Sequence, residues 1–150
     1  MATLVGKQAE FSDALKELCE LDFDAVEAYK AAIERLENNS YKEKLKQFMQ
    51  DHIRHTTELS QLLSQHQVKA PTGPGSKSLL AKGKVVLGGL VGDKTILAAM
   101  KTNEDDTNTA YERLNAHQGK WPESVQILAR GLEDEKRHRA WIEEVLSKEK

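Results

Sequence analysis

This sequence has a single cysteine, only short apolar runs and no large excess of either charge. Its one cysteine, Cys19, cannot form a disulfide within the chain, and we expect it to be a small buried residue in a reducing compartment. The 22 basic and 24 acidic residues give a net charge of -2 and are spread along the chain, so no polyanion-binding face is indicated. The composition therefore argues against a nucleic-acid partner.

Apolar stretches are too short to predict a membrane span or a secretory leader. The longest run of apolar and glycine residues is VVLGGLVG, residues 85–92, which is far below the length that a bilayer requires. The opening MATLVGKQAEF lacks a basic start followed by an apolar segment, so we expect a cytoplasmic protein. With 150 residues and 39% hydrophobic content, residues 1–150 can form one domain with a buried core.

Helical signals dominate the rest of the sequence. Apolar residues recur at alternating intervals of three and four, which predicts helices over residues 12–37, 41–64, 94–117 and 122–148. Residues 65–93 would form a long crossover, in which KSLLAKGKVVLGGL is a candidate for a short extra helix. The predicted fold class is all-α, an antiparallel four-helix bundle whose second and third helices run parallel.

Capping residues mark the starts of these helices. Ser12 or Asp13 can cap the first helix, because their side chains accept hydrogen bonds from free backbone amides. Ser40 with Glu43 forms a capping-box pattern before the second helix. Pro122 opens the fourth helix, since proline is favoured at the first helical position.

Polar residues interrupt the apolar seam of each predicted helix. Measured along the helices from the turns that close the two hairpins, the interruptions all lie roughly 20 Å from a closed end. They would therefore meet in one layer of the bundle. The residues concerned are Asp22, His52, His55, Glu104, Glu135 and His138.

Three carboxylates and three imidazoles in one buried layer need compensation. Left unpaired in an apolar interior, they would destabilise the bundle strongly. Carboxylate oxygen and neutral imidazole nitrogen are donors that iron, manganese and zinc accept, so the layer predicts a metal site. Pairing of the acids with the histidines in a dry polar layer is the alternative.

A weak internal repeat relates the two predicted hairpins. The segments HIRHTTEL and EKRHRAWI align His55 with His138. Tyr29 and Tyr111 each follow a seam acid by seven residues. The first hairpin therefore resembles the second, and both contribute to the predicted layer.

The helices, the crossover and the polar layer together resemble the ferritin-like superfamily, which includes the ferritins and rubrerythrins. The resemblance covers the chain from about Ser12 to Leu146 and implies a single ferritin-like domain. The superfamily's di-metal pattern has one acid on each of helices one and three, and an acid followed by histidine at the third position on helices two and four.

This sequence matches the pattern on three helices and departs from it on the second. Asp22 and Glu104 take the places of the single acids, and Glu135 starts the acid-x-x-His element of the fourth helix. His52 stands where an acid is expected before His55, so three carboxylates replace four. Two divalent ions would be incompletely neutralised, which leaves room for a single ion, for zinc, or for a bridging hydroxide. Asp51, at the edge of the seam, is a candidate outer partner.

The resemblance implies a function as well as a fold. It implies a metal-binding protein with one or two ions of iron, manganese or zinc, which reacts with oxygen or peroxide or handles iron in a stress response. The chain is similar in pattern to small bacterial ferritin-like domain proteins, and Tyr29 or Tyr111 would hydrogen-bond a metal ligand. The alternative is a non-catalytic helical stress or interaction protein whose polar layer is a remnant. Metal ions are the expected partners, and assembly into a homo-oligomer is left open.

Overall fold

Long α-helices account for most of the computed structural model, which describes residues 3–74 and 90–148. A short 3-10 helix, η1 (Pro122–Ser124), leads into the last of them. No strand occurs in these two ranges, so the all-α prediction is confirmed. The long helices are α1 (Phe11–Arg35), α2 (Asn39–Gln65), α4 (Asp93–Ala116) and α5 (Val125–Lys148).

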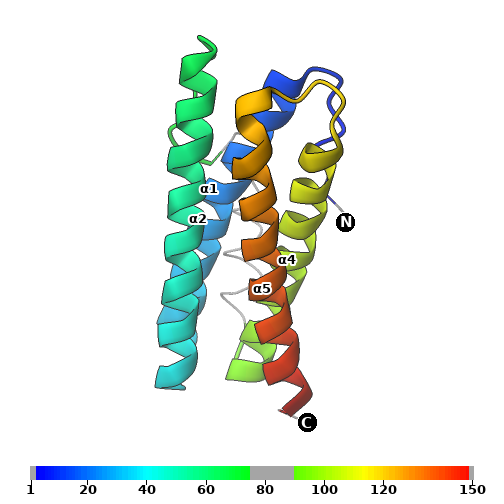
Figure 1. Cartoon of the computed structure of the whole chain (residues 1–150). Coiled ribbons are helices and arrows are strands. Elements are labelled where there is room, and N and C mark those ends of the chain that lie inside the picture. Colours follow the sequence, from blue (N-terminus) through cyan, green and yellow to red (C-terminus); the bar gives the residue numbers. More distant parts are fainter. Residues whose placement is uncertain (1–2, 75–89, 149–150) are drawn as a thin grey trace.

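The helices form two antiparallel hairpins packed side by side (Figure 1). One hairpin is α1 with α2, and the other is α4 with α5. Helices α2 and α4 run in the same direction, as predicted for the second and third helices of a bundle with a long crossover. The candidate extra helix KSLLAKGKVVLGGL, residues 77–90, lies outside the described ranges except for Leu90.

The helix starts differ from the predicted caps. The helix α1 follows Glu10 without a side-chain capping bond, so Ser12 lies inside the first turn instead of capping it. The side chain of Asn38 caps α2 by accepting hydrogen bonds from the backbone amides of Ser40 (2.9 Å) and Tyr41 (3.1 Å). The predicted capping box at Ser40 is therefore wrong, because the helix begins one residue earlier, at Asn39.

The polar layer separates two apolar clusters in the interior. Along α1, Leu18 belongs to one cluster and Tyr29 to the other, and Asp22 lies between them. Both clusters draw side chains from all four long helices, which fixes the rotation of each helix about its axis. The first cluster includes Phe11, Leu15, Leu59, Leu114 and Leu128, and the second includes Ala32, Leu45, Phe48, Ile96, Met100 and Ile142.

Cys19 is a buried packing residue, as the sequence predicts. It belongs to the first apolar cluster, and its Sγ donates to the carbonyl oxygen of Thr56 at 3.8 Å. Burial raises the pKa of its thiol to about 12. At neutral pH it is therefore protonated and unreactive as a nucleophile.

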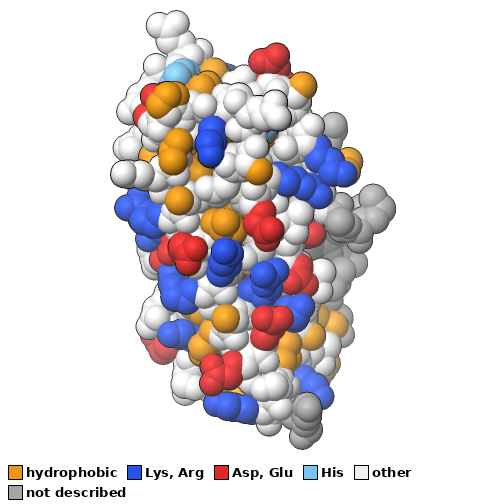
Figure 2. Space-filling model, turned by 45° about the vertical axis from the view of Figure 1, so that its right-hand side comes forward, with side chains coloured by type: hydrophobic (Ala, Val, Ile, Leu, Met, Phe, Trp, Pro, Cys, Tyr) orange, Lys and Arg blue, Asp and Glu red, His pale blue; other side chains and the backbone are white. Residues whose placement is uncertain are grey.

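Charges of both signs are mixed on the surface. Figure 2 shows basic and acidic side chains interspersed over one face of the bundle. Among the residues that the structure describes, no helix has the length and apolar character needed to cross a membrane.

Candidate metal centre

All six ligand-type residues predicted from the sequence come together between the two apolar clusters. Each side chain is almost completely inaccessible to solvent, with exposed fractions of 0 to 2%. The layer draws on every long helix, because α1 and α4 each supply one acid, α2 supplies two histidines and α5 supplies an acid and a histidine. The residues are Asp22, His52, His55, Glu104, Glu135 and His138.

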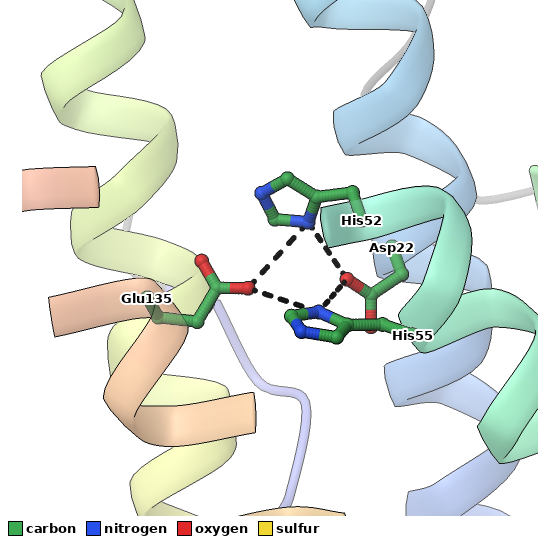
Figure 3. A group of neighbouring side chains, drawn as sticks. All are labelled: Asp22, His52, His55 and Glu135. Carbon is green, nitrogen blue, oxygen red and sulfur yellow. Dashed lines mark hydrogen bonds and ion pairs between the residues drawn. The ribbon is translucent and has the colours of Figure 1, made fainter. Parts of the chain in front are cut away.

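Four of these residues form a closed ring of donor atoms, which we call the first ligand group (Asp22, His52, His55 and Glu135; Figure 3). Oδ1 of Asp22 lies 2.8 Å from Nδ1 of His52 and 3.2 Å from Nδ1 of His55. Oε1 of Glu135 closes the ring, 3.5 Å from the same nitrogen of His52 and 3.4 Å from that of His55. Oxygen and nitrogen donors alternate around the ring.

The second ligand group shares two residues with the first and adds two (His52, Glu104, Glu135 and His138). Nε2 of His52 lies 3.4 Å from Oε2 of Glu104. Nδ1 of His138 lies 3.1 Å from Oε1 of Glu104 and 3.7 Å from Oε2 of Glu135. The shared residues therefore present different atoms to the two groups.

Two aspartates at the edge of the layer hold the outer histidines from the facing helix. Nε2 of His138 donates to Asp51 at 2.8 Å, and Nε2 of His55 donates to Asp134 at 2.9 Å. An ionised aspartate only accepts hydrogen bonds, so in both histidines the proton on Nε2 is fixed and Nδ1 faces the layer. Asp51 is the outer partner that the sequence suggested.

The sequence reasoning missed Asp134, although a pattern in the sequence contains it. Both α2 and α5 carry the pattern Asp-x-x-Arg-His, at Asp51 to His55 and at Asp134 to His138. Arg137 bridges the two aspartates, at 2.8 Å from Asp51 and 3.0 Å from Asp134, and Arg54 pairs with Asp134. The repeated pattern thus builds an ion-pair network over the layer, between α2 and α5.

Neighbouring polar side chains fix individual carboxylate oxygens. The hydroxyl of Tyr111 donates to Oδ2 of Asp22 at 2.6 Å. The Thr107 hydroxyl donates to Oε2 of Glu135 at 2.9 Å. The amide of Asn108 donates to the backbone oxygens of Glu104 (2.8 Å) and Glu135 (3.0 Å). Thr107 and Asn108 were not singled out in the sequence.

Two atoms in the middle of the layer have no hydrogen-bond partner among the described residues. They are Oε1 of Glu135 and Nε2 of His52, both on completely buried side chains, and the groups nearest to them, at 3.4 to 3.5 Å, make ion-pair contacts without hydrogen bonds. An unpaired buried polar atom usually costs about 1–3 kcal/mol, so such atoms are rare without a ligand, ion or water. A cation bound within the first ligand group would give Oε1 of Glu135 a partner.

The charges in the layer stabilise one another. Burial alone would lower the pKa of the three histidines, but the surrounding carboxylates raise it to about 9 for His52, about 12 for His55 and about 11 for His138. Burial alone would raise the pKa of Glu104, whereas the hydrogen bond with His138 and the nearby imidazole of His52 lower it to about 2. Without a metal, the histidines are therefore protonated, and protons compete with metal ions for the same nitrogens.

The fold and the layer define the chain as a four-helix-bundle protein with a buried histidine–carboxylate cluster. The profile of the family described as "Domain of unknown function (DUF2383)" matches residues 10–116, and the chain belongs to this family. The matched part includes Asp22, His52, His55 and Glu104, whereas α5 lies beyond it.

A solved structure shares the fold. The crystal structure of a conserved hypothetical protein, rv2844, from Mycobacterium tuberculosis is 14% identical in sequence, with a TM-score of 0.75 over 91% of each chain. At this identity the likeness concerns the fold alone. A comparison with curated proteins gave no significant match.

Proposed function

We propose that this chain is a ferritin-like metal-binding protein that holds a divalent transition-metal ion in the buried layer. The observation that carries the proposal is the convergence of three carboxylates and three imidazoles in two overlapping ligand groups, within which Oε1 of Glu135 accepts no hydrogen bond from the described residues. Imidazole nitrogen with carboxylate oxygen is a donor set for zinc, iron or manganese. The outer aspartates support it, because metal-binding histidines usually donate their second N–H to a carboxylate or carbonyl.

Oxidation chemistry is a second candidate function, favoured by the tyrosines beside the layer. Tyr111 donates to Asp22 at 2.6 Å, and the ring centroid of Tyr29 lies 5.3 Å from that of His52. If iron occupies the layer, it would supply the reaction with oxygen or peroxide that the ferritin-like resemblance implies. Tyr111 would then hold Asp22 in place, and the apolar clusters on both sides would limit the access of water.

Metal content and metal-dependent stability test the proposal. Protein purified without chelator or affinity-tag metal should contain a stoichiometric transition metal. After its removal, ferrous, manganous or zinc ions under anaerobic conditions should raise the melting temperature, because a ligand that binds only the folded state stabilises it. The increment should grow with free metal concentration. No bound metal and no rise in melting temperature would contradict the proposal.

A double variant links the effect to the layer. Glu135→Met with His138→Leu replaces two buried ligands by apolar side chains of similar size and should abolish the metal-dependent rise. The metal-free double variant should be as stable as the metal-free parent or more so, because buried charges lose their desolvation cost. Glu133→Ala, on the exposed face of α5, is the matched control and should keep the full rise.

A further inference from the structure

We infer that the layer holds a single four-coordinate divalent ion in the first ligand group, and that Glu104 and His138 support this ion instead of binding a second one. The inference rests on the proposed metal binding and specifies the number of ions and their coordination. It departs from the di-metal pattern of the ferritin-like superfamily, and it follows from differences between the two ligand groups.

The first ligand group has the spacing of a four-coordinate site. With metal–donor bonds of about 2.0–2.2 Å, the donors of a tetrahedral ion lie about 3.3–3.6 Å from one another. The four neighbouring donor pairs of the ring are separated by 2.8, 3.2, 3.4 and 3.5 Å, and the two pairs across the ring lie within 4.8 Å. Small movements of the side chains would therefore complete a site with two nitrogen and two oxygen donors.

The second ligand group has no such ring. His52 and His138 approach different oxygens of Glu104, Oε2 and Oε1, so the two histidines do not converge on one carboxylate atom. The hydroxyl of Thr107 lies between its two carboxylates, 2.9 Å from Oε2 of Glu135 and 3.4 Å from Oε2 of Glu104. The oxygen that Glu135 turns to this group is therefore already hydrogen-bonded, whereas Oε1 faces the first group without a donor.

His52 cannot serve both groups as a neutral ligand. A neutral imidazole has one lone pair for a metal and one N–H. If Nδ1 binds the ion beside Asp22, the proton stays on Nε2, which faces Oε2 of Glu104 at 3.4 Å. Glu104 is then the nearest acceptor for that proton, and a small movement of its side chain would give His52 the kind of support that Asp134 gives His55 at 2.9 Å.

The charge balance also favours one divalent ion in the layer. The carboxylates of Asp22 and Glu135 neutralise one divalent ion within the first ligand group. Glu104 remains paired with His138, at 3.1 Å. A second divalent ion would place four positive charges against three buried carboxylates and would leave charge unneutralised in the interior. Zinc and cobaltous ions suit the first group, since both accept four nitrogen and oxygen donors in a tetrahedral arrangement.

Cobaltous ion is a direct probe of number and geometry. The full-length chain, freed of metal, would be titrated with Co²⁺ under anaerobic conditions, with bound cobalt measured by equilibrium dialysis and coordination by visible absorption. We expect one equivalent per chain and the intense absorption of four-coordinate cobalt. Two equivalents, or the weak absorption of six-coordinate cobalt, would overturn the inference and leave the proposed metal binding intact. No binding at all would overturn both.

The repeat supplies a matched pair of variants. His55 and His138 occupy the same place in the Asp-x-x-Arg-His pattern, but only His55 belongs to the first ligand group. His55→Ala should abolish tight binding and the absorption. His138→Ala should keep one four-coordinate ion with an affinity lower by about 10- to 100-fold, the usual loss when a residue supporting a metal ligand is changed. Equal losses in the two variants would overturn the inference.

An isosteric pair keeps the test valid if an alanine variant unfolds. Asp22→Asn removes the charge of a first-group carboxylate, and Glu104→Gln removes that of the supporting carboxylate without changing its size. Helical content by circular dichroism would confirm that both variants are folded. Asp22→Asn should lose four-coordinate cobalt, whereas Glu104→Gln should retain it, and the reverse result would contradict the assignment.

Discussion

The two hairpins of the bundle follow one plan and differ at a few positions around the buried layer. Both contain an acid followed seven residues later by a tyrosine, and both contain the Asp-x-x-Arg-His pattern. His52 of the first hairpin corresponds to Glu135 of the second, and Ala25 corresponds to Thr107. These differences replace a carboxylate by an imidazole and place a hydroxyl beside only one ligand group, so a nearly symmetric scaffold presents two unequal halves.

The largest effect should come from His52→Glu, which makes the first hairpin identical to the second at this position. In the metal-free protein this change removes an imidazolium and adds a fourth buried carboxylate, so we expect the free energy of unfolding to fall by about 3–5 kcal/mol. Four carboxylates can neutralise two divalent ions, and bound Co²⁺ should rise from one to two equivalents. Urea unfolding and equilibrium dialysis measure the two effects. Gln47→Glu, which adds a charge to the exposed face of α2, should change neither.

Raising the pH should lower the stability of the metal-free protein, because its buried histidines lose their charge. Their pKa is raised from 6.5 to about 9 in His52, about 11 in His138 and about 12 in His55, so their stabilising contribution is complete below pH 6.5 and is lost as pH rises toward 12. The pKa of Glu104 is lowered from 4.5 to about 2, so its contribution is lost as pH falls below 4.5.

Metal-free protein should therefore be most stable between about pH 4.5 and 6.5, and less stable at pH 9. Urea unfolding across this range checks the expectation, and a stability that rises steadily from pH 6.5 to pH 9 would contradict it. The stability gained on adding metal should show the opposite trend and grow with pH, because protons leave the histidine nitrogens as metal binds.

A smaller effect should follow from adding a methyl group at Gly131, which lies against the ring of Tyr111. A Cβ atom at Gly131 would clash with Cε1 of the Tyr111 ring and lie 3.0 Å from its Cδ1. At an ordinary exposed helix position, glycine to alanine stabilises by up to about 1 kcal/mol. Gly131→Ala should instead destabilise by about 1–3 kcal/mol through overpacking. Urea unfolding measures the change, and a rise in the free energy of unfolding would contradict the overpacking. Gln126→Ala, on the exposed face of α5, is the control and should be near neutral.

The sequence was sufficient for the helices and for the six residues of the layer, because both depend on spacing along a helix. Asp22 and Glu104 interrupt an apolar seam, and a seam residue must face the interior whatever the details of packing. The role of Asp134 could not be obtained this way, since it depends on how closely α2 and α5 approach and on the rotamer of His55. The cap at Asn38 was missed for a local reason, because Ser40 offered an equally good pattern two residues later.

The smallest expected effect compares the two outer aspartates. Asp134 accepts from Nε2 of His55, which belongs to the first ligand group, and Asp51 accepts from Nε2 of His138, which does not. Asp134→Asn should lower the affinity for Co²⁺ by about 10- to 100-fold, because the histidine that binds the ion loses its charged acceptor.

Asp51→Asn should change that affinity by less than about tenfold, because its histidine stays outside the coordination sphere. The two variants are well matched: each keeps the size of the side chain, and each removes one ion pair to Arg137. Competition between the protein and a chelator of known affinity gives both values. Equal losses would mean that His138 binds metal as His55 does, in the same ion or in a second one, and would contradict the unequal roles assigned to the two histidines.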